Sequence, residues 1–250
     1  SGARSLVSMK QVGLNVAADP LLTGTYLGVK GGLVIVVADD PGPHSSQTEQ
    51  DTRNFANFAK VPVFDPADPQ EALDMTIEAF NISERYHLPV ILRPTTRVCH
   101  VCQDVNIPET YFTSPKARFE KGSDYVIFPN VSRRKHSELI DTLQNISEDF
   151  STSAFNLTAG EDDRGIVCSG VSYYYVKEAL QRLQVKPAVL KIGTPYPFPD
   201  KLVTSFIKDK KSLLVVEELD PVLENEIFRL VGKTGIKTEL HGKNDRLVPG

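Results

Sequence analysis

The sequence predicts an α/β protein with two open, mostly parallel sheets and flanking helices. Apolar runs such as 33–38 do not alternate with polar residues, which is typical of strands covered on both faces. Helical patterns separate these runs, and that rhythm favours a parallel sheet. Between residues 103 and 160 the rhythm is interrupted by spaced prolines and charges, so two units are expected.

The first unit is expected to span residues 1–102. Its clearest signal is a helix that opens with Asp68 as N-cap, Pro69 at the first helical position and Glu71 three residues after the cap. The other expected elements are strands over 5–10, 33–38, 61–64 and 87–93, a Gly- and Ala-rich helical stretch over 12–29, and a helix over 48–60.

Residues 103–160 are expected to connect the units and to hold one amphipathic helix over about 137–150. The basic run at 133–135 is interpreted as a solvated helix start. The second unit, 161–250, repeats the alternation of strand and helix. Its expected strands cover 165–170, 188–193, 212–220 and 236–240, and its helices cover 173–183, 200–209 and a stretch that opens at Pro221.

Composition and charge exclude several classes of partner. The formal net charge of -4 argues against a nucleic acid or an anionic membrane held by charge. No apolar run approaches the roughly 18 residues that cross a bilayer. Three cysteines, an odd number, do not make a disulfide framework, and a reducing cytoplasm is the simplest compartment.

The polar loop after the apolar run 33–38 is the first candidate site. Ligands of open parallel sheets bind beyond the carboxyl ends of the strands, which is where this loop lies. His44 has the loop's only near-neutral reference pKa, and Asp40, Ser45 and Gln47 lie close to it in sequence. No strand–elbow–helix pattern surrounds its serines, so serine hydrolysis is not expected. The side-chain chemistry alone supports a functional site and an ordinary polar loop equally well.

The cysteines form a weaker candidate. Cys99 and Cys102 make a lone C-x-x-C motif, whereas zinc needs two more ligands and Cys168 lies in the other unit. We interpret the motif as incidental. A small redox protein remains an alternative, and it requires a thiol of depressed pKa at Cys99 or Cys102.

Two further strand ends carry polar groups. Cys168-Ser-Gly170 could hold an anion at a helix start, but no complete nucleotide-binding fingerprint is present, and a structural turn is favoured. Glu217, Glu218 and Asp220 could bind Mg²⁺ or act as acid and base. Because Pro221 follows them, we favour stabilisation of the next helix N-terminus.

Specific motifs run in order through nearly the whole chain, including Ala38-Asp-Asp-Pro-Gly-Pro-His-Ser-Ser-Gln47 and Leu92-Arg-Pro-Thr-Thr-Arg97. The others cover 9–21, 28–34, 49–51, 165–180, 194–199 and 216–219. Together they resemble the alpha subunits of the indolepyruvate ferredoxin oxidoreductase family. These are thiamine-diphosphate-dependent 2-oxoacid:ferredoxin oxidoreductases.

The resemblance implies a fold and a reaction. The first unit would be a pyrimidine-binding-type domain that lacks its N-terminal part, and the second a transketolase C-terminal-type domain. The reaction would be oxidative decarboxylation of indolepyruvate-like aryl pyruvates with coenzyme A, in the catabolism of aromatic amino acids. Its products would be an aryl-acetyl-CoA, CO₂ and reduced ferredoxin.

The resemblance also implies cofactors and partners. Thiamine diphosphate with Mg²⁺ and 4Fe-4S clusters would belong to the full-length enzyme, and this chain is not expected to hold any of them fully. The partners would be a beta subunit of the same oxidoreductase and ferredoxin, in an oligomeric cytoplasmic enzyme. We expect this chain to be the central part of the longer subunit and to be inactive alone.

For the site, the resemblance implies His44 and Ser45 as catalytic residues and Asn15, Asp40 and Gln47 as cofactor contacts, with no metal ligand. Related pyruvate enzymes have a substrate-binding arginine about where Asp39 stands, and Asp39 cannot take that role because it would repel a carboxylate. The alternative from another class is a non-catalytic α/β scaffold or subunit-interaction module.

Overall fold

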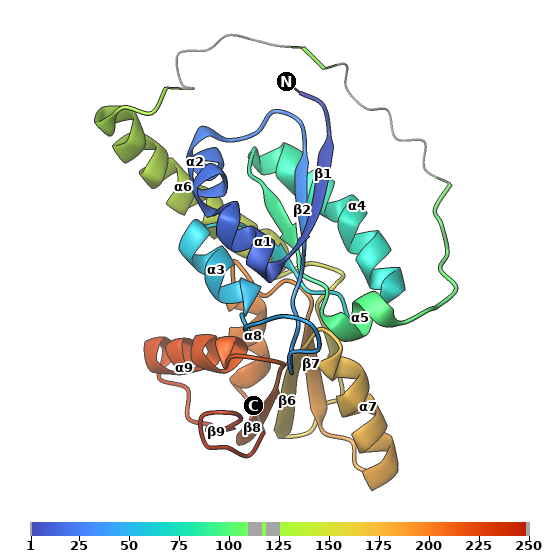
Figure 1. Ribbon diagram of the computed structural model, residues 1–250. Coiled ribbons are helices and arrows are strands. Elements are labelled where there is room, and N and C mark those ends of the chain that lie inside the picture. Colours follow the sequence, from blue (N-terminus) through green and yellow to red (C-terminus); the bar gives the residue numbers. More distant parts are fainter. Residues whose placement is uncertain (1, 110–116, 119–125, 249–250) are drawn as a thin grey trace.

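The chain forms two stacked α/β units, each built around its own sheet (Figure 1). The computed structural model describes residues 2–109, 117–118 and 126–248. The first sheet has the strand order β1-β2-β4-β3, and all its strands are parallel. The second has the order β5-β7-β6-β8-β9, in which only β5 is antiparallel among the described strands. The predicted fold class is confirmed.

The first sheet consists of strands close to those predicted. They are β1 (Ser5–Lys10), β2 (Leu33–Ala38), β3 (Val63–Phe64) and β4 (Val90–Leu92). Lys10 pairs in register with Ala38, so the carboxyl ends of β1 and β2 lie side by side.

Helices cover this sheet on both faces, as the unbroken apolar run of β2 predicted. Val34 packs against α4 and α6 in one apolar cluster, and Ile35 and Val37 pack against α1–α3 in another. The helices are α1 (Gln11–Val16), α2 (Ala18–Leu27), α3 (Thr52–Ala59), α4 (Pro69–Tyr86), α5 (Thr96–His100) and α6 (Pro129–Phe150).

Helix boundaries follow local capping. Asp68 accepts a hydrogen bond from Glu71 N at 2.8 Å and starts α4 where predicted. The helix expected over 48–60 begins only at Thr52, because Asp51 caps it by accepting from Arg53 N. The helix expected from 137 begins at Pro129 and packs on the first unit through residues such as Leu143.

The second sheet carries one helix on one face and two on the other. Its strands are β5 (Leu157–Ala159), β6 (Arg164–Ser169), β7 (Ala188–Ile192), β8 (Ser212–Val216) and β9 (Glu239–His241). Its helices are α7 (Ser172–Leu183), α8 (Asp200–Ile207) and α9 (Val222–Thr234). The larger apolar cluster lies under α8 and α9, and a smaller one lies under α7.

The carboxyl ends of the two sheets face each other. Asp65, directly after β3, donates its N–H to Gly193 O, directly after β7, at 2.8 Å. Val63 N likewise donates to Tyr196 O at 2.7 Å. Gly193 also lies close to Met75 of α4 and to Phe155, since an added Cβ would lie 2.7 Å from Met75 Cε and from Phe155 O. Within the described ranges, no helix is long and apolar enough to span a bilayer.

Candidate functional site

The candidate loop, residues 39–51, lies at the junction where the two sheets meet. It leaves the end of β2 and runs beside α5 (Figure 1). Asp39 N donates to Pro94 O at 3.2 Å, and Thr96 N donates to Asp39 O at 3.0 Å, so the loop starts against the chain that follows β4. The loop therefore occupies the edge where an open parallel sheet binds its ligands.

Asp40 organises the loop from within. Its carboxylate accepts hydrogen bonds from the backbone N–H groups of His44, Ser45 and Ser46 at 3.2, 3.0 and 3.0 Å. The hydroxyl of Thr96 donates to its other oxygen at 2.7 Å. The Thr96 hydroxyl and the loop N–H groups hold the pKa of Asp40 well below its usual range, because they stabilise the ionised carboxylate. Asp40 is buried, and its oxygens face these donors.

The structure leaves His44 and Ser45 exposed on the outside of this loop. The Ser45 hydroxyl accepts a hydrogen bond from Lys10 Nζ at 2.7 Å. Lys10 also lies 3.4 Å from Asp40 and keeps 41% of its side chain exposed. Sequence reasoning passed over Lys10, although its place at the end of the strand before β2 would have put it at the same sheet edge.

Asn15 and Gln47, the other two predicted cofactor contacts, both lie at this loop. Asn15, exposed on α1, donates from Nδ2 to Gln50 Oε1 at 2.8 Å, so it contacts the later part of the loop. Gln47 lies in the loop between Ser45 and Gln50, and its side chain is exposed. The structure thus brings Asn15 and Lys10 to opposite parts of the same loop.

The two ends of the loop are held together by buried ionic contacts. Asp39 accepts from Thr52 N at 3.0 Å and from Arg93 Nε at 2.6 Å. Asp51 accepts from Arg53 Nη2 at 2.6 Å, and it lies 3.8 Å from Arg93. Asp39 therefore has a structural partner, in keeping with its exclusion as a substrate anchor.

The pKa values of the buried acids at this junction are shifted in different directions, according to whether burial or the nearby arginines dominate. Burial raises the pKa of Asp65, which contacts Arg93 at 3.2 Å, and also that of Glu217, although arginines favour their ionised forms. Burial acts on Asp51 in the same sense, but Arg53 and Arg93 outweigh it and lower its pKa to about 2.

The cysteines of the C-x-x-C motif are free thiols at the end of α5. Cys99 lies within α5 and Cys102 lies beyond its end, so the motif does not open a helix. Burial raises the pKa of Cys99, which is the reverse of what the redox alternative requires. Burial also raises the pKa of Cys168 to about 12.

The other two polar strand ends make contacts within the protein. Glu217 accepts from Leu223 N and Glu224 N at 3.0 Å each and thereby stabilises the start of α9. Gly170, at φ +51°, lies against Asp65, whose Oδ1 would be 2.9 Å from an added Cβ. Among the described residues, no group of three or more His, Cys, Asp or Glu could hold a metal ion.

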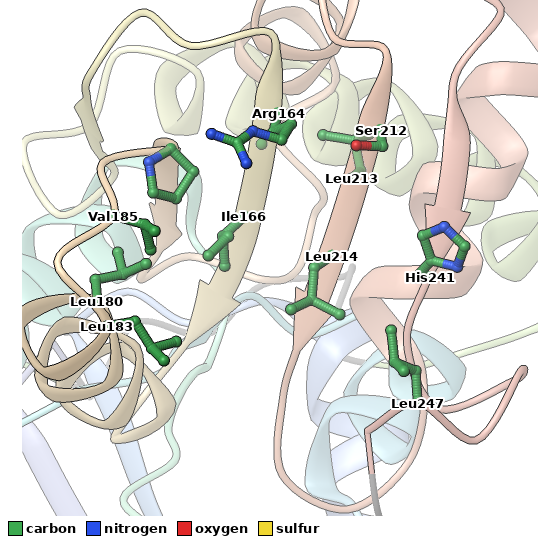
Figure 2. Close-up of a pocket in the computed structure, with 12 residues that line it drawn as sticks. Arg164, Ile166, Leu180, Leu183, Val185, Ser212, Leu213, Leu214, His241 and Leu247 are labelled. Carbon is green, nitrogen blue, oxygen red and sulfur yellow. The ribbon is translucent and has the colours of Figure 1, made fainter.

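An open pocket lies elsewhere, in the second unit. It has a volume of about 290 Å³ and is lined mainly by apolar side chains between α7, β6 and β8, as Figure 2 shows for Ile166, Leu180 and Leu214. Arg164 and Ser212, the first residues of β6 and β8, also line it. The pocket is therefore at the amino end of the second sheet, away from the loop.

Comparison with known proteins places this geometry in a family. Residues 27–153 match the family described as pyruvate flavodoxin/ferredoxin oxidoreductase, thiamine diphosphate-binding. The indolepyruvate oxidoreductase subunit IorA of Pyrococcus abyssi is 46% identical over all of this chain, which covers 40% of that protein. The IorA subunit of Methanothermobacter marburgensis is 41% identical over the whole chain, which covers 41% of it. The chain thus spans about 40% of the length of these relatives.

Solved structures agree on the fold. A 2-oxoglutarate:ferredoxin oxidoreductase from Magnetococcus marinus superimposes with a TM-score of 0.65 at 18% identity, over 95% of this chain and 50% of that one. A split-gene transketolase gives a TM-score of 0.59 at 17% identity, over 95% of this chain and 66% of that one. The chain belongs to the pyruvate flavodoxin/ferredoxin oxidoreductase family, whose thiamine-diphosphate-binding domain its residues 27–153 match.

Proposed function

We propose that this chain is the central part of the alpha subunit of an indolepyruvate-type 2-oxoacid:ferredoxin oxidoreductase. The observation that carries the proposal is 46% identity along the entire chain to a relative named as an indolepyruvate oxidoreductase subunit. The position of the candidate loop at the carboxyl ends of two facing sheets supports it, because ligands of such sheets bind there.

In the proposed reaction, an aryl pyruvate loses CO₂ and two electrons, and its acyl group joins the sulfur of coenzyme A. Two one-electron ferredoxins accept the electrons, and the thiol proton is released. The 4Fe-4S clusters implied for other parts of the full-length enzyme would supply the electron-transfer chemistry. Thiamine diphosphate, when bound, supplies the stabilisation of the carbanion. The protein contributes binding, orientation and the exclusion of water.

The described residues fit one side of such a cofactor. Asn15 on α1 and Gln47 on the loop expose amide groups that can donate to or accept from a pyrimidine ring, while buried Asp40 holds the loop that presents Gln47. This chain covers only 40% of the Pyrococcus abyssi subunit, and we assign the diphosphate with its Mg²⁺ to other parts of the full-length enzyme.

His44 and Ser45 are the proposed catalytic residues. The His44 imidazole is exposed on the loop, and its two ring nitrogens can donate and accept hydrogen bonds with a substrate. Lys10 donates to the Ser45 hydroxyl oxygen, which leaves the hydroxyl proton free to be donated to a substrate oxygen. The loop itself, fixed by Asp40, keeps the two side chains next to each other.

The proposed surroundings are a beta subunit, ferredoxin and an oligomeric cytoplasmic assembly. The word subunit in the relative's name and its greater length support a partner subunit, since this chain covers only 40% of the Pyrococcus abyssi protein. The ferredoxin and the cytoplasmic compartment are carried over from the resemblance as part of the proposal.

The test is kinetic, on the full-length subunit assembled with its partner. We expect H44A to lower kcat/KM for indolepyruvate by roughly 100-fold, the lower range for loss of a general acid or base. S45A should give a smaller loss in the same direction. H100A, which removes another exposed histidine, is the matched control and should retain wild-type kinetics. Unchanged kcat/KM in both H44A and S45A would favour the scaffold or subunit-interaction alternative.

A further inference from the structure

Arg53 is the side chain through which the loop and the second unit are joined. It lies in the first turn of α3, two residues after the loop's last residue, Asp51. Only 1% of it is exposed. Burial of a guanidinium costs free energy unless its donors are paired, so the partners of Arg53 indicate which contacts this side chain stabilises.

Those partners come from both units. On the loop side, Arg53 Nη2 and Nε donate to Asp51 at 2.6 and 2.9 Å. On the other side, Nη1 donates to Glu217 Oε2 at 2.7 Å, and Nη2 donates to the carbonyls of Glu218 and Asp220 at 2.8 and 3.1 Å. One planar group therefore binds the loop end and the turn after β8.

The turn that Arg53 contacts has an unusual backbone. Leu219 lies at φ +63°, a left-handed conformation that branched side chains rarely adopt. The two carbonyls that accept from Arg53 Nη2 belong to the residues on either side of Leu219. Such conformations persist where surrounding contacts over-determine them, and they cluster at functional sites.

Contacts around Arg53 transmit this constraint to the loop. Asp220 N donates to Asp51 Oδ2 at 3.2 Å, and Asn54 Nδ2 donates to Asp220 Oδ2 at 2.6 Å. Through Thr52 N, which donates to Asp39 at 3.0 Å, the last part of the loop is also joined to its first residue. A shift of the turn relative to α3 would therefore move both ends of the loop.

We propose that Arg53 is a positioning residue that locks the loop 39–51 onto the turn Glu217–Asp220, so that the placement of His44 and Ser45 depends on the second unit. This inference rests on the proposed function of the loop. It assigns the second unit a part in placing the loop, through the contacts of Arg53 with the turn after β8. A misplacement of about 1 Å can lower a rate by up to roughly 100-fold, so such a lock is of kinetic consequence.

Lysine cannot replace arginine in this role. A lysine ammonium is a single point with three donors, whereas Arg53 serves Asp51, Glu217 and two carbonyls from a rigid fork. R53K therefore keeps the positive charge but loses the planar arrangement of donors that binds these groups. The matched control is R229K, because Arg229 also bridges two carboxylates, Asp200 and Glu226, but does so on the surface within the second unit.

The experiment measures kcat and KM separately in the assembled full-length enzyme, per mole of bound thiamine diphosphate. For R53K we expect kcat to fall at least about tenfold, with KM for the 2-oxoacid within about twofold of wild type, because loop placement is perturbed more than ground-state binding. R229K should change neither. Ethylguanidinium should partly restore kcat to R53A by filling the vacated site.

Two results would overturn the positioning role. One is an R53K enzyme whose kcat per bound cofactor stays within twofold of wild type. The other is a loss that disappears when the assay temperature is lowered well below the melting temperature, which is the behaviour of a merely structural residue. If R53K does not assemble, E217Q decides by the same criteria, since it places an amide where Glu217 accepts from Arg53.

The failure of this inference is distinguishable from failure of the proposed function. If H44A and S45A lower kcat while R53K does not, only the positioning role is wrong. If H44A and S45A leave kcat unchanged, the loop is not catalytic. That result contradicts both the proposed function of the loop and the positioning role of Arg53.

Discussion

At the scale of single residues, Asp40 shows how the sequence builds a fixed loop. Three consecutive backbone N–H groups, those of His44, Ser45 and Ser46, converge on one buried carboxylate. Pro41 and Pro43, which lie between Asp40 and His44, cannot donate backbone hydrogen bonds and favour the turn. The loop thus has a defined conformation although most of its side chains are exposed.

We predict that D40N destabilises the protein in a pH-dependent way. The folded pKa of Asp40 is lowered, so the folded state binds fewer protons than the unfolded state, whose Asp pKa is about 3.9. This contribution to stability is present above about pH 4 and is lost as the pH falls through the folded pKa. At pH 7 the loss in D40N should be about 1–3 kcal/mol, the usual cost of leaving such donors unpaired.

Urea unfolding at several pH values checks this. The difference in unfolding free energy between wild type and D40N should shrink between pH 5 and pH 3. D74N, which alters a carboxylate on the flank of α4, should stay within about 0.5 kcal/mol of wild type. A D40N deficit of equal size at pH 7 and pH 3 would show that ionisation of Asp40 is not what holds the loop.

Sequence reasoning located part of this site and missed the rest for a physical reason. The position of His44 and Ser45 follows from local signals, namely an apolar strand and the polar turn after it. The partners of Arg53 in the turn after β8 are 164 to 167 residues away in sequence, and no local pattern reveals such pairs. Arg93 was assigned to a strand, but its ion pairs with Asp39 and Asp65 depend on how β2, β3 and β4 lie in the sheet.

At the scale of elements, prediction was best where the signal was local. The cap at Asp68 and the apolar runs of β2 and β8 gave elements close to those observed. β5 was missed because its three residues are exposed and it adds to the sheet edge beside β7, so it needs no apolar pattern. The segment 103–160 therefore supplies a strand of the second sheet as well as helix α6 of the first unit.

Two glycines in the second unit should respond to alanine in opposite ways. Gly170, between β6 and α7, has φ +51° and faces the carboxylate of Asp65, so G170A should destabilise by about 1–2 kcal/mol. Gly232 lies in α9 with nothing within 4 Å of an added Cβ, and G232A should stabilise by about 0.5–1 kcal/mol. Denaturant midpoints of the two variants test this, and a stable G170A would contradict the close packing of the two units there.

At the scale of the whole molecule, the junction between the units is the most heavily charged buried region described. Four carboxylates (Asp39, Asp51, Asp65 and Glu217) surround two arginines (Arg53 and Arg93). Breaking one partner of such a network leaves uncompensated buried charge, so the units are held in a specific relation rather than loosely. The loop projects from this junction, and the relatives extend well beyond the region that this chain covers.

The most direct test of the account is the reaction of the assembled, full-length enzyme with indolepyruvate, coenzyme A and oxidised ferredoxin. The account predicts that indolyl-acetyl-CoA, CO₂ and reduced ferredoxin form in the ratio 1:1:2, with a higher kcat/KM for indolepyruvate than for pyruvate or 2-oxoglutarate. Absence of a CoA thioester, or a preference for pyruvate or 2-oxoglutarate, would contradict it.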